Sequence, residues 1–228
     1  VFPLSFWLPD SYPTAPAPVT AVFAGLLTKV GVYAMIRTET QIFRENDVNQ
    51  LLLIVALATM IVGILGAVAQ AELKRILSFT LVSHIGYMVF GLAIATPESL
   101  GATIYYMVHH IVVQTTLFLA VGLVERRAGS TSILKVKGLM RAAPLIAVLY
   151  FIPAINLGGL PPFSGFIGKY ALFDAAAAVG TPLMYALIVA GILTSLLTLY
   201  ALMRAWNLSF WREEEDQNEE SGVVDRIS

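Results

Sequence analysis

Cysteine is absent from this chain of 228 residues, and charged residues make up only 13% of it. Without thiolates the chain can supply neither an iron–sulfur cluster nor a disulfide framework. Any redox chemistry would therefore need another chain or a cofactor held by histidine. The formal net charge of −1 also gives no basic surface, which argues against a nucleic-acid partner.

A charged leader with a cleavage pattern is absent as well. Val1 stands directly in an apolar phrase, so no signal peptide is expected, and the sequence is interpreted as a piece of a longer chain.

Apolar residues are what the chain has in quantity: 57% of it is hydrophobic and its mean hydropathy is +0.77. A soluble domain carries roughly 25% charged residues. The apolar residues form runs of the ~20 residues that cross ~30 Å of hydrocarbon at 1.5 Å per residue. The sequence therefore predicts an all-α, polytopic transmembrane helix bundle in a lipid bilayer, with five or six crossings.

We divide the chain into a transmembrane domain, residues 1–211, and an acidic polar loop or tail, residues 212–228. The expected spans are about 19–37, 51–70, 77–95, 101–124, a broken span at 142–179, and 182–206. In the second span, Gly63 and Ala67 stand four residues apart, a spacing of small side chains that favours close helix packing.

The segment 142–179 has about 38 residues, nearly twice what a helix needs to cross, with GGLPP in its middle. Two short spans or one broken span fit this length. One crossing would put ten basic residues on one side and Arg37 and Arg44 on the other, whereas two crossings would give seven against five. The ten are Lys74, Arg75, Arg126, Arg127, Lys135, Lys137, Arg141, Arg204, Arg212 and Arg226. The bias favours one broken crossing and places the loops after spans two, four and six in the cytoplasm. In the first of these loops, Glu72, Lys74 and Arg75 are expected to lie in a solvated turn that anchors the helix end.

Two lysines, Lys29 and Lys169, fall inside predicted spans. A charge at the centre of a span costs ~2.5–3.5 kcal/mol, so each must face protein or water, find a partner, or be neutral part of the time. Snorkelling to an interface is the competing interpretation. Lys29 is about 8 residues, or ~12 Å, from Arg37, which is far for a lysine side chain. At Lys169 the helix break itself requires a protein-lined or watery cavity. We therefore favour a proton relay at both lysines.

Histidines add candidate relay groups to the fourth span. His109 and His110 are ~100° apart around a helix, so at most one is expected to line a given path. Histidine suits proton hopping, and a packing role for either one stays open. Gln114 lies on the face of His110 and can hydrogen-bond without carrying a proton charge. His84 raises a rival idea, a haem held between two histidines, which nothing else in the sequence supports. We therefore expect no cofactor, and the sequence assigns no metal ligands.

Four phrases resemble the antiporter-like membrane subunits shared by respiratory NADH:quinone oxidoreductase, membrane-bound hydrogenases and Mrp-type cation/proton antiporters, and are closest to the D subunits of the Mrp group. They are FPLSFWLPDSYPTAPAPVTAVFAGLLTKVGVYAMIR, LKRILSFTLVSHIGYMVFG, MVHHIVVQTTLFLAVG and LGGLPPFSGFIGKYALF. The resemblance covers about residues 1–206. It implies a fourteen-helix fold with two inverted five-helix repeats, of which this chain would be a partial chain holding helices eight to thirteen.

The resemblance also implies roles for single residues. Lys29 matches the lysine of helix eight, Lys169 the ionisable residue of broken helix twelve, and His109 or His110 the histidine of helix eleven. Gln114 stands where many relatives have a lysine, so a proton could pass there only through bound water. The family's remaining relay groups would lie outside this sequence, and the piece alone is not expected to transport.

Three functions follow as hypotheses. The first is a non-enzymatic subunit of a multisubunit antiporter in the cell membrane, which works with other integral membrane subunits and exchanges protons for Na⁺ or another monovalent cation. The second is a proton-pumping membrane subunit of an NADH:quinone oxidoreductase or a membrane-bound hydrogenase, with the electron carriers on other chains. The third is a structural anchor whose buried lysines pair with acids on neighbouring helices.

Overall fold

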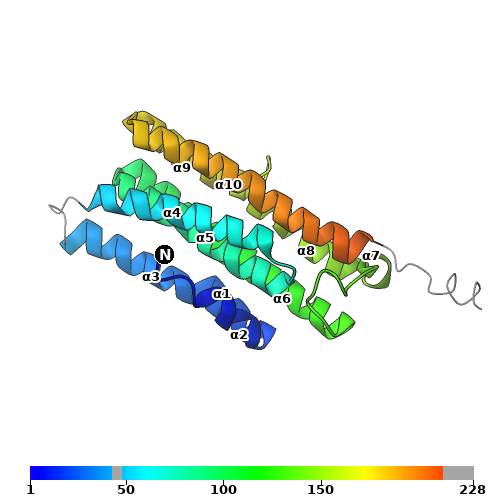
Figure 1. The fold of residues 1–228 in the computed structure, drawn as a ribbon. Coiled ribbons are helices and arrows are strands. Elements are labelled where there is room, and N and C mark those ends of the chain that lie inside the picture. Colours follow the sequence, from blue (N-terminus) through cyan, green and yellow to red (C-terminus); the bar gives the residue numbers. More distant parts are fainter. Residues whose placement is uncertain (43–47, 213–228) are drawn as a thin grey trace, which may run out of the picture.

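The computed structural model describes residues 1–42 and 48–212, so the acidic segment after Arg212 lies outside the described residues, as do Arg44 and Arg226. The helices are α1 (Leu8–Ser11), α2 (Ala17–Val22), α3 (Thr28–Arg37), α4 (Asn49–Ala69), α5 (Leu73–Ile94), α6 (Pro97–Ala128), α7 (Leu139–Ala142), α8 (Pro144–Gly158), α9 (Ser164–Val179) and α10 (Pro182–Trp206). Figure 1 shows them packed side by side in an elongated bundle. The predicted all-helical architecture is confirmed.

Within residues 1–42 and 48–212, five helical stretches are long and apolar enough to cross a membrane. They are Ala17–Ile42, Asn49–Ala69, Leu73–Ile94, Pro97–Ala128 and Pro182–Trp211. The first combines α2 and α3 with the π-helical turns Phe23–Leu27 and Thr38–Ile42, and the last adds the π-helical turn Asn207–Trp211 to α10. All five overlap ranges in which the sequence predicts a span.

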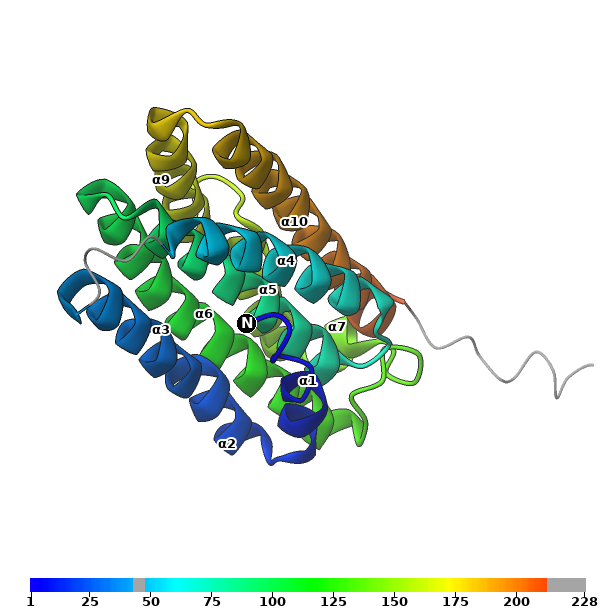
Figure 2. The same ribbon diagram turned by 60° about the vertical axis from the view of Figure 1, so that its left-hand side comes forward.

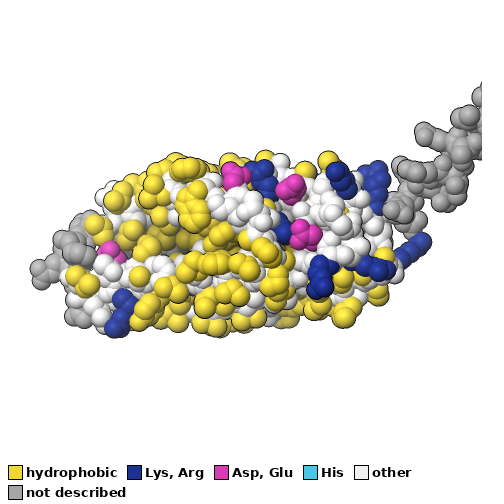
Figure 3. Space-filling model, turned by 90° about the horizontal axis from the view of Figure 1, so that it is seen from below, with side chains coloured by type: hydrophobic (Ala, Val, Ile, Leu, Met, Phe, Trp, Pro, Cys, Tyr) yellow, Lys and Arg dark blue, Asp and Glu magenta, His cyan; other side chains and the backbone are white. Residues whose placement is uncertain are grey.

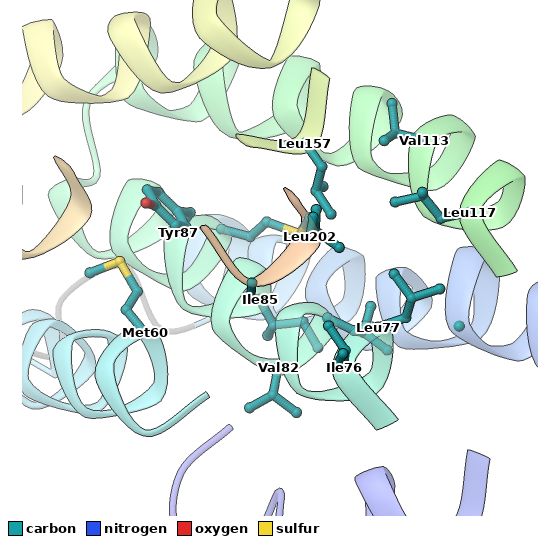
Figure 4. Packing of buried hydrophobic residues seen from close by; sticks show 14 of the residues in the cluster. Met60, Ile76, Leu77, Val82, Ile85, Tyr87, Val113, Leu117, Leu157 and Leu202 are labelled. Atoms are coloured by element: carbon teal, nitrogen blue, oxygen red, sulfur yellow. The ribbon is translucent and has the colours of Figure 1, made fainter. Parts of the chain in front are cut away.

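Helix α5 is the centre of the bundle, with 94% of its most apolar stretch buried, against 39% for α4 and for α10. Figure 2 shows α4, α6 and α10 around it. Figure 4 shows side chains of α5 among those of the neighbouring helices. The labelled residues of α5 are Ile76, Leu77, Val82, Ile85 and Tyr87. The others are Met60 of α4, Val113 and Leu117 of α6, Leu157 of α8 and Leu202 of α10. A helix enclosed in this way can carry polar side chains that never meet lipid.

Helices α8 and α9 are two halves of one interrupted crossing. The N–H of Gly138, just before α7 and α8, donates to the carbonyl of Arg212, just beyond α10, at 2.8 Å. At the other end, α9 turns through Gly180 directly into α10. Their 15 and 16 residues therefore run beside the whole of α10 once, in the opposite direction. Of the two alternatives for this segment, the broken span is the one that the fold adopts.

The contact between α4 and α5 depends on Gly63. A Cβ atom at this position would come within 2.5 Å of the backbone nitrogen of Ser83 and 2.8 Å of its Cα. The hydroxyl of Ser83 donates to the carbonyl of Met60 at 2.9 Å, and Ala67 is buried one turn further on. The predicted packing role of Gly63 and Ala67 is thus confirmed.

On the face seen in Figure 3, most charged side chains lie toward one end of the bundle, while apolar side chains cover the middle. At the charged end, Lys74 pairs with Glu125 at 2.8 Å and Arg75 with Asp10 at 2.6 Å. The sequence favours a solvated turn for this stretch, which is wrong for Lys74, because its side chain is only 6% exposed. The first turn of α5 packs against α6, and the ion pair with Glu125 allows the amine to be buried there.

We expect Gly63→Ala to lower the stability of the purified assembly by about 1–3 kcal/mol, because the added methyl group would press on the backbone of α5. Gly101→Ala is the matched control, since a Cβ atom there meets nothing within 4 Å. Thermal unfolding in detergent measures the difference, and equal melting temperatures for the two variants would contradict the packing argument.

Candidate functional site

Lys29 follows directly on a π-helical turn. The turn Phe23–Leu27 leads into α3, and the amine of Lys29 donates to the carbonyl of Ala24, five residues back, at 2.7 Å. Such turns interrupt the regular ladder of helical hydrogen bonds and are frequent at functional sites. The residue is only 2% exposed. The side chain therefore stays inside the bundle and does not snorkel to an end of the helix.

Lys169 lies in the second turn of α9, beside the helix break, and is 3% exposed. Its amine donates to the carbonyls of Leu157 and Gly158, at 2.9 and 3.2 Å. These are the last carbonyls of α8, which have no helical N–H partner and form the negative end of that helix dipole. The amine also stands 5.2 Å from the ring centroid of Tyr87, within the range of a cation–π contact.

Neither lysine is neutralised by an acid in the described part of the chain. The ion pairs found there join Lys74 to Glu125 and Arg75 to Asp10. The anchor hypothesis requires both buried lysines to pair with acids on neighbouring helices, and residues 1–42 and 48–212 supply none. In the described residues, the acceptors of both amines are uncharged backbone carbonyls: that of Ala24 for Lys29, and those of Leu157 and Gly158 for Lys169.

His84 of α5 contacts polar side chains of α6 and α10. Its Nδ1 lies 2.5 Å from the hydroxyl of Tyr106, and its Nε2 lies 3.4 Å from the hydroxyl of Thr198. Its ring centroid is 5.1 Å from that of His110. The residue is completely buried.

A haem does not fit between these histidines. A porphyrin held by His84 and His110 would need its own plane between the two imidazole rings. The rings are packed too closely for that, and the ring of Tyr106 lies against both, at 6.1 and 6.3 Å. The packing of these three rings therefore overturns the haem alternative.

The adjacent histidines of α6 point to different neighbours. His109 Nδ1 is 2.9 Å from the hydroxyl of Ser164, the first residue of α9, and that hydroxyl donates to Asn156 Oδ1 at 3.3 Å. His110 turns toward His84, and neither of its ring nitrogens has a hydrogen-bond partner within the described ranges. His109 thus joins the helix break, whereas His110 joins the centre of the bundle.

Gln114 lies one turn beyond His110 and links α6 to α5. Its amide nitrogen donates to the carbonyl of Leu77 at 2.8 Å. Its Oε1 is buried and finds no hydrogen-bond partner among the residues that the structure describes.

Together these side chains form what we call the buried polar row: Lys29, His110, His84, Tyr106, Tyr87 and Lys169, from helices α3, α5, α6 and α9. Consecutive rings in it are 5.1 to 6.1 Å apart, from His110 through His84 and Tyr106 to Tyr87. Of the predicted site residues, the structure brings Lys29, His110 and Lys169 into this row. His109 lies beside it at the break, and Gln114 lies one helical turn away.

Sequence reasoning missed several members of the site. Asn156 closes the break, since its Oδ1 accepts from the backbone N–H of Gly165 at 2.9 Å as well as from Ser164. A polar residue in an apolar span is a signal that could have identified it. No such signal exists for Tyr87 and Tyr106, because a tyrosine in a span usually only packs.

The row holds groups that can bind and release protons or hydrogen-bond to those that do. Within the described ranges, no three His, Asp or Glu side chains gather in a way that could hold a metal ion. Any cation would have to be bound by neutral oxygens or aromatic faces.

Comparisons with known proteins show what the chain as a whole is similar to. A profile of the family described as NADH:quinone oxidoreductase/Mrp antiporter, transmembrane, matches residues 1–198. The D subunit of the Na(+)/H(+) antiporter of Alkalihalophilus pseudofirmus is 44% identical over 223 residues, which are 97% of this chain and 45% of that protein. The chain thus spans less than half the length of this relative.

Solved structures show the same likeness. A chain of the Mrp complex from Dietzia sp. is 39% identical with a TM-score of 0.89, covering 94% of this chain and 40% of that one. A chain of respiratory complex I from Thermus thermophilus is 27% identical with a TM-score of 0.84, covering 99% of this chain and 49% of that one. The likeness confirms a partial antiporter-like fold.

We expect Asn156→Ala to destabilise the purified assembly by about 1 kcal/mol, because the N–H of Gly165 loses its acceptor. Asn156→Asp keeps an acceptor oxygen and adds a charge that favours the N-terminus of α9. The aspartate variant should therefore melt closer to the unchanged protein. An alanine variant as stable as both would show that the side chain does not cap α9.

Proposed function

Because the chain belongs to the NADH:quinone oxidoreductase/Mrp antiporter family of membrane proteins, we propose that it is part of the D subunit of an Mrp-type Na⁺/H⁺ antiporter. The observation that supports this most directly is the buried polar row between Lys29 and Lys169, enclosed in a bundle of apolar helices. The relative from Alkalihalophilus pseudofirmus, which is named as part of a Na(+)/H(+) antiporter, supports the choice of ions.

In the proposed mechanism, Lys29 and Lys169 take up and release protons in alternation, and the row between them carries the proton. His110 accepts from the side of Lys29 and passes the proton on toward His84, whose ring centroid is 5.1 Å away. His84 then continues the path, since one of its nitrogens contacts the hydroxyl of Tyr106 and the other lies toward Thr198. An imidazole can receive a proton on one nitrogen and release it from the other.

The helix break forms the far end of this path. When Lys169 is protonated, the two carbonyls of α8 and the ring of Tyr87 stabilise its charge. His109 connects through Ser164 to the same break. Gln114 would join the relay only through a bound water, because an amide cannot carry the proton itself.

We also propose a place and partners for the chain. It lies in the cell membrane, with the loops after spans two, four and six in the cytoplasm. The basic residues Lys74, Arg75 and Arg126 stand at that end, following the preference of cytoplasmic loops for Lys and Arg. Exposed apolar side chains on α3, α4 and α10 would face lipid or the other membrane subunits of the complex.

A second candidate is a proton-pumping membrane subunit of a redox complex. The similarity to a chain of respiratory complex I favours it, because 99% of this chain is covered. Purification of the native assembly separates the two functions. An antiporter should show no flavin, iron–sulfur or haem absorption, whereas a redox complex should show at least one of them.

We expect Lys29→Ala and Lys169→Ala each to reduce Na⁺-driven proton movement to background in vesicles that contain the full assembly. Arginine at either position should fail too, because it does not release its proton in a protein. Fluorescence of a pH-sensitive dye after a sodium pulse measures the exchange.

Lys135→Ala is the control for these variants, because Lys135 is exposed in the loop after α6. It should keep the exchange at the level of the unchanged assembly. Full activity in both alanine variants would refute the relay, provided that the vesicles contain equal amounts of the assembled complex.

The orientation can be tested with single cysteines, since the 228 residues contain none. We expect Arg37→Cys to react with a membrane-impermeant maleimide in intact cells. Lys135→Cys should react only after the membrane is opened. The reverse pattern would show that the loops face the opposite compartments.

A further inference from the structure

The amine of Lys169 occupies a pocket made for a cation. Two main-chain carbonyls, those of Leu157 and Gly158, accept its protons, and the face of the Tyr87 ring lies 5.2 Å away. We call these three groups the cation cradle. None of them carries a charge, so the cradle attracts cations through carbonyl dipoles and an aromatic quadrupole.

The two carbonyls are available because of how α8 ends. The N–H of Gly159 donates to the carbonyls of Ile155 and Asn156, and the N–H of Leu160 donates to the carbonyl of Ile155. Both acceptors precede Leu157 in the chain. Leu157 and Gly158 are thereby left at the negative end of the α8 dipole, and among the described residues the lysine amine is the donor that satisfies them. In transporters, carbonyls at the ends of interrupted helices are the groups that coordinate Na⁺.

The aromatic wall of the cradle is held in place by α10. The hydroxyl of Tyr87 contacts the carbonyl of Gly191, the hydroxyl of Thr194 at 2.6 Å and the hydroxyl of Ser195 at 2.8 Å. These contacts fix the ring so that its face, rather than its edge, is turned to the break.

A cavity of about 440 Å³ reaches the cradle from the side, between the break, α9 and α10. Lys169, Gly158 and Ser195 belong to its lining, together with apolar residues such as Leu196. The polar groups in this lining include the Lys169 amine, the Ser195 hydroxyl and the backbone at the break, so this part of the cavity offers partners to an ion.

Gly159 lets the lysine lie close to the break. Its backbone has φ +88°, a region that favours glycine, and a Cβ atom there would stand 3.1 Å from Lys169 Cδ and 3.3 Å from its Nζ. With no side chain at this position, the lysine can lie against the backbone of the break and reach the two carbonyls.

We propose that the cation cradle is a Na⁺ site, in which the amine of Lys169 acts as a tethered competitor of the ion. The cradle is thus where the Na⁺ of the proposed exchange would bind, so this proposal rests on the proposed function. The neutral donors suit one monovalent ion, because a divalent ion is usually bound by carboxylates, of which the cradle has none. Either Na⁺ or the lysine amine can occupy the cradle, but not both.

Binding of radioactive sodium to the purified assembly tests the site without any transport. Lys169→Met removes the competing charge and keeps a similar length, whereas Lys169→Arg fills the cradle permanently. We expect the methionine variant to bind Na⁺ at least about tenfold more tightly than the arginine variant, because two like charges cannot share the buried cradle. Lys29→Met and Lys29→Arg, the same changes outside the cradle, should bind Na⁺ equally well.

Equal binding in the two Lys169 variants would overturn the site. A second comparison covers the case in which they do not assemble: with Lys169 in place, Tyr87→Leu should weaken Na⁺ binding about three- to tenfold. Tyr87→Phe keeps the aromatic face but loses the hydroxyl contacts to α10, so it should weaken binding less. Equal effects of Leu and Phe would also overturn it. The two proposals can fail separately. If the unchanged assembly exchanges no Na⁺ for protons in vesicles, but the Lys169 variants still differ in Na⁺ binding, the proposed function is wrong and the Na⁺ site is supported.

Discussion

The shortage of hydrogen-bond partners inside a lipid-embedded bundle governs how this chain places its charges. Each buried amine must find acceptors within the protein, and the fold provides them at irregular points of its helices. Lys29 uses the carbonyl of Ala24 in a π-helical turn, and Lys169 uses the last two carbonyls of α8. A carbonyl of a regular helix already accepts one bond along the ladder, whereas the last carbonyls of α8 have no helical N–H partner. The irregular points of the two helices thus supply acceptors to the two buried amines.

The enclosed position of α5 is the second condition for the site. This helix brings His84 and Tyr87 to the middle of the bundle, where α6 adds Tyr106 and His110. Helix α10 contributes hydroxyls that contact both residues of α5. Since lipid reaches hardly any part of α5, the polar groups of three helices can meet without exposing any of them to hydrocarbon. The outer helices thus separate the buried polar row from the lipid.

Much of the fold could be predicted from the sequence, because a membrane leaves few choices for long apolar runs. The break at GGLPP and the burial of Lys29 and Lys169 follow from local composition. The hydrogen-bond partners do not, since they depend on how distant helices are placed. His84 could be considered only as a haem ligand, because its spacing says nothing about Tyr106. The sequence assigns Lys74 to a solvated turn for the same reason, as its partner Glu125 is about 50 residues away in the chain.

The enclosure of α5 has a consequence for biogenesis. Emerging alone from the translocon, this helix would present Thr80, Ser83 and His84 to acyl chains on every side. Only the short turn 70–72 separates it from α4, whose most apolar stretch is more hydrophobic than that of α5. The two helices are therefore suited to enter the bilayer together as a preformed hairpin, in which the more apolar α4 provides most of the driving force. Insertion of α5 would then depend on a neighbour that is synthesised immediately before it.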